Sequence, residues 1–231
     1  MFINQLKNWI LPYSCLLCNN ASDEDRDLCG ACASELPWLQ QACDRCGISL
    51  PENQTCGDCL THTPPYNRTL ALWSYEQPID HFITQFKFQH RLVFSRLLAS
   101  MLIQKIQKEY EVSDLPEYII PVPLHPDRLK ERGFNQALEI AKPIAAQLKL
   151  KIDTTHCVRS KATAAQSTLL TTDDRRKNIK NAFTVNPLFQ TKHVAIIDDV
   201  VTTGHTVREL SKSLKQIGIQ KIDIWCCART A

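Results

Sequence analysis

The sequence predicts an α/β fold in which a mainly parallel sheet carries helices on both faces, preceded by a small cysteine-rich module. First, eight of the 11 cysteines form four C-x-x-C pairs within the first 59 residues. Second, strand-like and helix-like apolar patterns alternate after His62. Third, an apolar strand from Val194 ends in two aspartates and a polar turn. We therefore expect two domains, residues 1–62 and residues 63–231.

The cysteine spacing indicates metal binding. Two C-x-x-C pairs complete a closed shell of four thiolates, the structural type of zinc site. Such a site supplies most of the folding energy of a small module, about 10 kcal/mol, and carries no chemistry of its own. We expect two zinc ribbons with sequential pairing, and a cross-braced pairing is the alternative. The expected ligand sets are Cys15, Cys18, Cys29 and Cys32 for one zinc, and Cys43, Cys46, Cys56 and Cys59 for the other.

Composition and hydropathy argue against a membrane or secreted protein. Hydrophobic residues make up 44% of the chain, but no apolar run approaches the roughly 20 residues of a membrane-spanning helix. Polar residues such as Asn4 and Lys7 interrupt the apolar residues at the N-terminus, and no small-residue cleavage site follows. We expect a soluble, cytoplasmic protein without a membrane span.

Charge is distributed unevenly along the chain. Residues 1–62 carry three Lys/Arg against eight Asp/Glu, and the remainder carries 24 against 16. A basic body suits a phosphate-rich ligand, which is either a small pyrophosphate ester or a nucleic acid backbone. Ordinary solvated charges on helix faces are the alternative.

The alternating patterns after His62 predict nine elements. Strands are expected at residues 69–75, 118–122, 155–159, 193–198 and 221–228. Helices are expected at residues 79–88, 92–108, 135–148 and 206–217. The strands of such an alternation form a mainly parallel sheet.

The segment from Val194 to Thr206 carries the sharpest motif. Its apolar run predicts a central strand, which places Asp198 and Asp199 at the carboxyl end, where open α/β sheets bind ligands. The following turn opens a helix whose N–H groups and dipole form an anion site, and Gly204 lets the backbone approach a phosphate closely. Two acids beside such a site fit ribose 5-phosphate. A Walker B strand is the alternative, but the chain has no G-x-x-x-x-G-K-[ST] motif.

This motif resembles the signature of type I phosphoribosyltransferases. The resemblance implies that Asp198 and Asp199 hold the ribose 2′- and 3′-hydroxyls and lie near the charge that develops at C1 in catalysis. It also implies that the loop wraps the 5-phosphate of 5-phosphoribosyl-1-pyrophosphate, through Thr202, Thr203, Gly204, His205 and Thr206. His205 stands where the family more often has a small residue, and we expect it to contribute its backbone N–H.

A second segment, P-V-P-L…R-x-x-x-R-G-F-N-Q-A from Pro121 to Ala137, resembles the competence protein F (ComF/GntX) family. That family also carries an N-terminal cysteine-rich zinc module, and the resemblance extends from Cys15 to Ala228. It implies that Arg128 and Arg132, in the turn after the strand, contact the pyrophosphate. Lys87 also matches the family pattern, without an assigned role.

The stretch from Arg159 to Phe183 is long and polar, and we expect a flexible loop. By resemblance, such a loop closes over the reaction centre and adds cations around the pyrophosphate. The candidate residues are Arg159, Gln166, Arg175 and Arg176. The spacing from Gln166 to Asn178 is one residue longer than the family pattern, which leaves the roles of Arg175 and Arg176 open.

The resemblance implies three alternative functions. The first is binding of 5-phosphoribosyl-1-pyrophosphate with Mg²⁺ by a protein that handles incoming single-stranded DNA during natural transformation. The second is an active phosphoribosyltransferase with an unidentified acceptor, in which pyrophosphate is displaced from ribose C1. The third is an interaction protein whose zinc ribbons recruit DNA-uptake proteins. The first is preferred, and turnover is left open.

Overall fold

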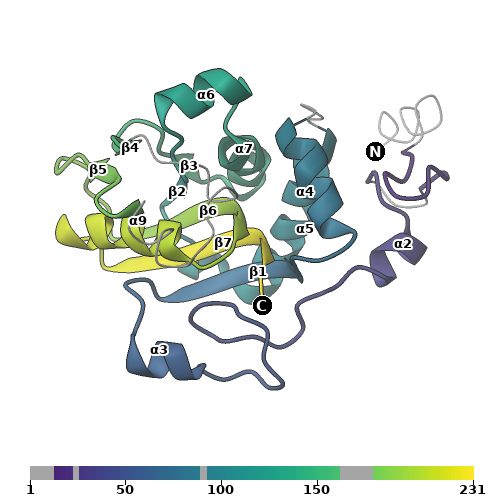
Figure 1. The fold of residues 1–231 in the computed structure, drawn as a ribbon, viewed down its shortest axis with the longest axis horizontal. Coiled ribbons are helices and arrows are strands. Elements are labelled where there is room, and N and C mark those ends of the chain that lie inside the picture. The colour runs from purple at the N-terminus through teal and green to yellow at the C-terminus, as the bar shows by residue number, and fades with distance from the viewer. Residues whose placement is uncertain (1–12, 23–25, 89–92, 162–178) are drawn as a thin grey trace.

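The computed structural model of the protein describes residues 13–22, 26–88, 93–161 and 179–231 (Figure 1). Three predicted loop residues, Gln166, Arg175 and Arg176, lie outside this part of the chain. Within it, no helix is both long and apolar enough to cross a membrane.

The centre of the molecule is a five-stranded sheet in which every pairing is parallel. The order along the sheet is β1-β7-β6-β2-β3. The strands are β1 (Arg68–Ser74), β2 (Tyr118–Pro121), β3 (Lys151–Ile152), β6 (His193–Val201) and β7 (Lys221–Arg229). The strand β6 is central, so its carboxyl end lies between those of β2 and β7, and apolar residues fill its interior.

Both faces of the sheet are covered. One face packs against α4 (Ile79–Phe88), α5 (Val93–Glu109) and α7 (Gln136–Leu148). The other packs against α9 (His205–Gln216) and an antiparallel pair formed by β4 (Cys157–Arg159) and β5 (Phe183–Val185). Figure 1 shows these two layers on either side of the sheet. The expected fold class, a mainly parallel sheet with helices on both faces, is confirmed.

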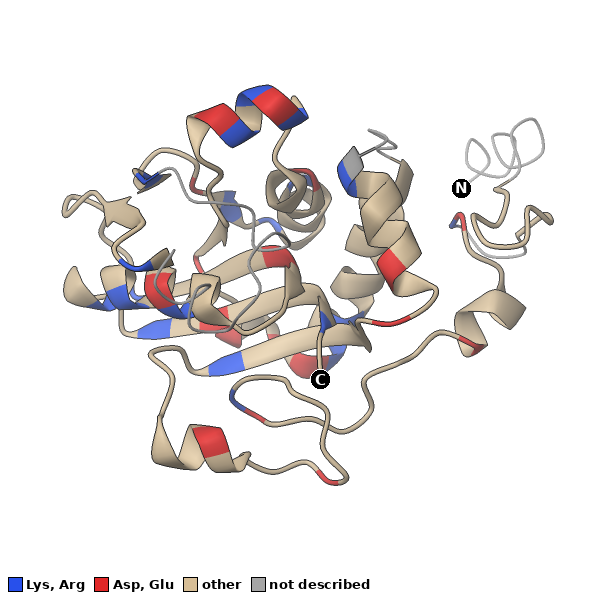
Figure 2. Cartoon of the chain, in the orientation of Figure 1, with Lys and Arg blue, Asp and Glu red and all other residues tan. Residues whose placement is uncertain are grey.

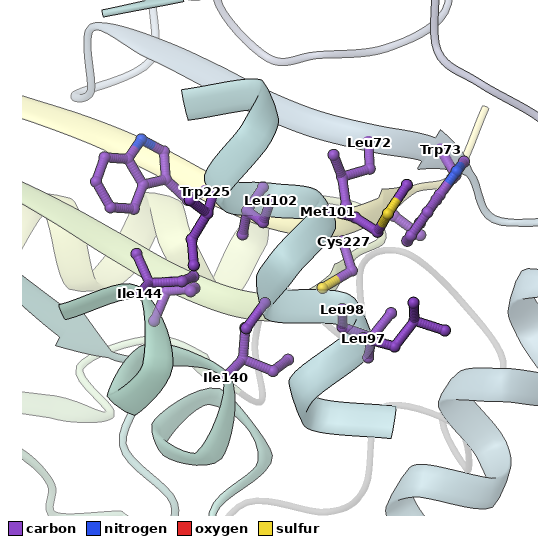
Figure 3. Packing of buried hydrophobic residues seen from close by; sticks show 14 of the residues in the cluster. Leu72, Trp73, Leu97, Leu98, Met101, Leu102, Ile140, Ile144, Trp225 and Cys227 are labelled. Atoms are coloured by element: carbon purple, nitrogen blue, oxygen red, sulfur yellow. The ribbon is translucent and has the colours of Figure 1, made fainter. Parts of the chain in front are cut away.

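The larger core cluster holds the sheet to its helices. Trp225 of β7 and Ile144 of α7 are fully buried, and Leu98 and Leu102 of α5 pack in the same cluster (Figure 3). Burial of one such side chain contributes about 2 kcal/mol. This packing holds α4, α5 and α7 against one face of the sheet.

The two halves of the cysteine-rich module contact different parts of the α/β body. The first half contains α2 (Gly30–Ser34), and its Leu28 is buried in the core cluster of α5. The second half contains α3 (Gly57–Thr61) and follows the edge strand β1, where the N–H of Leu39 donates to the carbonyl of Leu72 at 2.9 Å. In Figure 1, α2 and α3 accordingly lie far apart.

One sequence expectation needs correction. The segment after β2, expected to be a turn, forms the helix α6 (Pro126–Arg132), which begins at a proline and ends at Gly133 with φ of +74°. The stretch expected to be a loop follows β4, which ends at Arg159 where a strand was predicted, and leads to β5 at Phe183, which was not predicted. The short strand β3 and the turn η1 (Val112–Asp114) were not expected either. The nine predicted elements are all present, with ends within three residues of the prediction.

Candidate functional site

The acidic pair of β6 points to two sides of the sheet, as successive strand residues do. Asp199 is 5% exposed, and its Oδ2 lies 3.0 Å from Nζ of Lys87 in α4. Burial alone would lower the pKa of Lys87, but the Asp199 carboxylate raises it above its ordinary value through charge and a hydrogen bond. Lys87 therefore stays protonated at neutral pH and forms an ion pair with Asp199.

Asp198 has a different environment. Burial, followed by the charge of Asp199, raises the pKa of Asp198 to about 7, although Lys87 and Arg159 act in the opposite direction. Burial lowers the pKa of Arg159, and the charge of Asp198 opposes that change. Arg159 of β4 therefore lies close enough to Asp198 for a charge interaction. It reaches the acidic pair from a strand, not from a loop.

The loop after β6 has the features of an anion site. Gly204 is the N-cap of α9 with φ of +73°, and no acidic side chain occupies the first turn of that helix. The N–H groups of this turn and the helix dipole thus favour a bound anion. The hydroxyl of Thr203 is buried without a hydrogen-bond partner in the described part of the chain. Such an orphaned donor fits an oxygen of a bound phosphate.

One acid of the pair, Asp198, shares a cavity with the loop. Asp198 lines it together with the loop residues Thr202, Gly204 and Thr206. Thr203 and His205 also line a second, larger cleft that continues along α9. The structure thus brings the predicted acids and all five predicted loop residues to one end of β6.

The helix α6 follows β2, whose Pro121 is in register with Ile197, next to the acidic pair. Arg132 lies near enough to Lys87 to lower its pKa, and it donates to Oε1 of Gln136 at 3.0 Å. Arg128 likewise lowers the pKa of Arg159 and forms an ion pair of 2.8 Å with Glu131.

Four cations from three elements therefore lie in this region: Lys87 and Arg159 act on the acids directly, Arg132 lies near Lys87, and Arg128 lies near Arg159. Figure 2 shows acidic segments between the basic ones on α6, so this helix is not uniformly basic. The sequence pattern identified three of these cations as ligand contacts, and it left the role of Lys87 open. In the sequence, Lys87 lies between two phenylalanines of an apolar helix, and this position indicates that its charge is buried beside a partner.

The eight paired cysteines form two clusters. In each cluster the four Sγ atoms lie within 4.8 Å of one another, and the groups follow the sequential pairing, not the cross-braced one. Burial opposes ionisation, but backbone N–H donors outweigh it and lower the pKa of Cys15 to about 6 and that of Cys43 to about 7. The pKa of Cys32 is raised instead, by a hydrogen bond with Cys29, and burial raises the pKa of Cys46 and of Cys59. A shell of four cysteines suits a tetrahedral metal ion and leaves no position open for a substrate.

Comparisons with known proteins agree with both parts. Residues 6–60 match the family model of a double zinc ribbon domain, and residues 135–231 match that of a phosphoribosyl transferase domain. Competence protein F of Haemophilus influenzae is 34% identical and covers 94% of this chain and 97% of its own. The DNA utilization protein YhgH of Escherichia coli O157:H7 is 34% identical, with 88% of this chain and 90% of its own covered.

A more distant relative, competence protein ComFC of Streptococcus pneumoniae, is 24% identical over 99% of both chains. The double zinc ribbon match covers both cysteine clusters, and the phosphoribosyl transferase match covers the β6 motif that follows them in the chain. The chain belongs to the competence protein F family, in which a double zinc ribbon precedes a phosphoribosyltransferase domain.

Proposed function

We propose that this protein binds 5-phosphoribosyl-1-pyrophosphate with Mg²⁺ at the carboxyl end of β6, and that it handles incoming single-stranded DNA during natural transformation. The observation that carries the first part is what the carboxyl end of β6 brings together: an acidic pair, a loop at the start of α9 that shares a small cavity with Asp198, and the cations Lys87 and Arg159 beside the acids. The second part is supported by relatives named as competence and DNA utilization proteins.

Each group has a distinct role in this proposal. Asp198 and Asp199 accept hydrogen bonds from the ribose 2′- and 3′-hydroxyls. The N–H groups of residues 202–206 and the Thr203 hydroxyl bind the 5-phosphate. Arg128 and Arg132 bind the pyrophosphate, with Arg159 beside Asp198. When bound with the ligand, Mg²⁺ would neutralise charge on the pyrophosphate.

The two cysteine clusters each bind one structural zinc ion in this proposal. Their geometry supports it, since four thiols converge in both, and the double zinc ribbon match covers both clusters. The ribbons therefore stabilise the protein and take no part in the chemistry.

Transfer of the phosphoribosyl group to an acceptor is a second candidate function. A groove of about 440 Å³ runs between α6 and β4 and shares Arg159 with the acidic site. Its walls include Leu129, Phe134 and Val158, which suit a flat apolar acceptor. The test is release of pyrophosphate when candidate acceptors are added to protein saturated with the phosphoribosyl donor.

The preferred ligand can be tested by its parts. Thermal shifts would be measured with Mg²⁺ and 5-phosphoribosyl-1-pyrophosphate, ribose 5-phosphate or pyrophosphate alone. We expect the whole ligand to raise the Tm most, because it engages the acids, the loop and the arginines together. Equal shifts with pyrophosphate alone would contradict a site built around ribose 5-phosphate.

The DNA part is tested separately, by fluorescence anisotropy of a labelled single-stranded oligonucleotide. If residues 63–231 bind DNA directly through their excess of Lys and Arg, the affinity should fall steeply between 50 and 200 mM salt. The fall should be about 10³-fold if some six phosphates are contacted. Absence of binding at low salt would leave a partner protein, recruited by the zinc ribbons, as the better account.

A further inference from the structure

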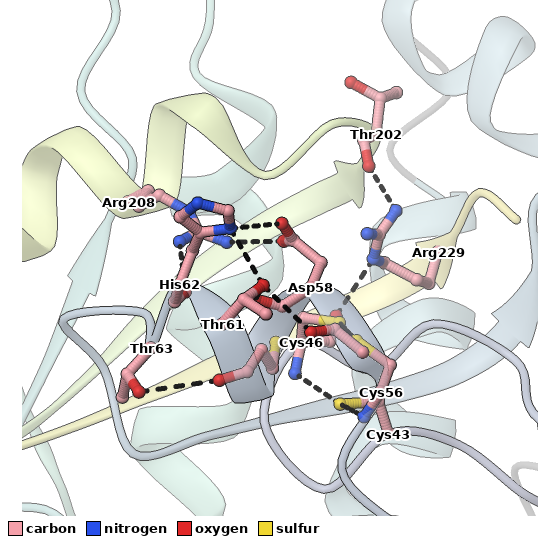
Figure 4. Close-up of polar contacts among 12 residues, drawn as sticks. Cys43, Cys46, Cys56, Asp58, Thr61, His62, Thr63, Thr202, Arg208 and Arg229 are labelled. Atoms are coloured by element: carbon pink, nitrogen blue, oxygen red, sulfur yellow. Dashed lines mark hydrogen bonds and ion pairs between the residues drawn. The ribbon is translucent and has the colours of Figure 1, made fainter.

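A buried arginine at the end of β7 joins the second zinc ribbon to the phosphate loop. Arg229 is 8% exposed, and its backbone is in register with Val201 at the end of β6. Its Nε donates to the carbonyl oxygen of Cys46 at 3.0 Å. Its Nη1 donates to the carbonyl of Val201 at 3.3 Å and to that of Thr202. Figure 4 shows the guanidinium between Thr202 and the cysteine cluster.

The remaining contacts fix this side chain further. Nη1 also donates to the carbonyl and the hydroxyl of Thr230, at 2.9 Å and 3.1 Å. Among the described residues the acceptors of Arg229 are thus carbonyl and hydroxyl oxygens from three segments. A planar guanidinium can satisfy acceptors in several directions at once, whereas a lysine ammonium on a flexible stem holds one geometry poorly. This position therefore requires arginine and not merely a positive charge.

A second arginine ties the same ribbon to the helix that follows the loop. Arg208 of α9 donates through Nη1 to the carbonyl of His62 at 3.1 Å, and its Nη2 lies 3.5 Å from Oδ2 of Asp58. Asp58 stands in α3, between the metal-site cysteines Cys56 and Cys59. The second ribbon is thus linked to the phosphate loop through Arg229, and it contacts α9 directly through Arg208 (Figure 4).

The first ribbon has no such arrangement among its described contacts. Its Arg26 donates to Oε1 of Gln104 in α5 at 3.3 Å, on the helical layer of the sheet. Leu28 is buried in the core cluster of the same helix. The two cysteine clusters thus offer a matched comparison, because one adjoins the phosphate loop and the other adjoins α5.

We propose that the second zinc ribbon positions the phosphate loop through Arg229. The metal site fixes the position of the Cys46 carbonyl, which accepts a hydrogen bond from the Arg229 guanidinium. The same guanidinium donates to the Thr202 carbonyl and so fixes the backbone whose N–H groups follow. A site whose donors are already oriented binds its anion more tightly than one that must order them on binding. Arg229 is a positioning residue in this account, and its role in ligand affinity rests on the proposed function.

Amide hydrogen exchange of the full-length, zinc-loaded protein tests the positioning without any ligand. In Arg229→Lys, the hydrogen-bonded amides around the loop should exchange at least about tenfold faster than in the wild type. These are the amide of Thr230, bonded to the Val201 carbonyl, and that of Arg208, bonded to the Gly204 carbonyl. In the matched variant Arg26→Lys, faster exchange should stay within the first ribbon and α5. Unchanged exchange of these two amides in Arg229→Lys, or equal acceleration in Arg26→Lys, would overturn the proposal.

Calorimetric titration with ribose 5-phosphate gives the second measurement. Arg229→Lys should weaken binding by about tenfold or more, and Arg26→Lys should bind as the wild type does. Equal affinities of Arg229→Lys and wild type would overturn the proposed role in binding. A wild type that binds no ribose 5-phosphate would refute the proposed function, and hydrogen exchange would still decide whether the ribbon holds the loop.

Discussion

Asp198 and Asp199 are adjacent in β6, but their side chains have opposite electrostatic surroundings. Asp199 is neutralised by Lys87 at 3.0 Å. Burial and its neighbour raise the pKa of Asp198 to about 7, so this carboxyl lacks a sufficient counter-charge. A ligand that brings hydroxyl donors and a divalent cation would supply one. The ligand class that the site is proposed to bind would thus reduce the electrostatic repulsion between the two close carboxylates.

The first residue-scale prediction concerns Lys87. Lys87→Met should lower the free energy of unfolding by about 3 kcal/mol at neutral pH, because it leaves the buried Asp199 charge without a partner. Lys105→Met is the matched control, since Lys105 forms a more exposed ion pair of 3.1 Å with Glu109. That control should cost less than about 1 kcal/mol. Urea denaturation measures both, and equal losses would contradict a buried Lys87–Asp199 pair.

The second concerns the pH dependence contributed by Asp198. The folded protein holds the Asp198 proton more tightly than the unfolded chain, because burial raises the pKa from 3.8 to about 7. The folded state therefore binds more protons between these values, and this group lowers stability as pH rises through that window. Asp198→Asn should raise the Tm at pH 8 by at least about 3 °C, with a smaller difference toward pH 4. A Tm difference that grows on acidification would contradict this.

At the scale of elements, the central part of the site follows from local pattern. The apolar run of β6, the two acids, the glycine turn and the amphipathic α9 agree in sequence and in structure because each depends on residues close together in the chain. Helix α6 was missed because Leu129 is its only apolar residue after the proline. Its helical state follows from the proline at its start and Gly133 at its end.

The position of Arg159 could not be predicted for a different reason. The pairing of β4 with β5 joins residues more than 20 positions apart and involves three residues in each strand. The strand ending at Arg159 was expected, but its partner β5 is too short to have a detectable period, so the placement of Arg159 beside the acids could not be predicted. The same holds for Arg229, whose contacts with Cys46 depend on the fold of the whole chain.

The packing of the second ribbon on β1 gives an element-scale prediction. Gly47 has φ of +69°, and a Cβ there would lie 2.9 Å from Cγ2 of Thr69. Gly218 has φ of +96° with open space around it. Both alanine substitutions should cost about 1 kcal/mol of backbone strain, and Gly47→Ala should cost at least about 1 kcal/mol more through overlap. Equal losses in urea denaturation would contradict close packing of the ribbon on the sheet edge.

At the scale of the whole molecule, the metal sites are part of the folding unit. Cys15 and Leu28 of the first ribbon are buried in the core cluster of α5. Metal analysis should find two zinc ions per chain, one for each cluster of four thiols. Chelation should lower the Tm by more than about 10 °C, because each site contributes about 10 kcal/mol. An unchanged Tm after verified zinc loss would contradict this structural role.

The central claim is that the carboxyl end of β6 binds a phosphoribosyl ligand through its two aspartates. Its most direct test is calorimetric titration of the zinc-loaded protein with Mg²⁺ and 5-phosphoribosyl-1-pyrophosphate. The comparison includes Asp198→Asn/Asp199→Asn and a control, Asp114→Asn, which alters an exposed acid in η1. We predict one binding site in the wild type and the control, and no measurable binding in the double variant. Binding that survives in the double variant, or is absent from the wild type, would contradict the claim.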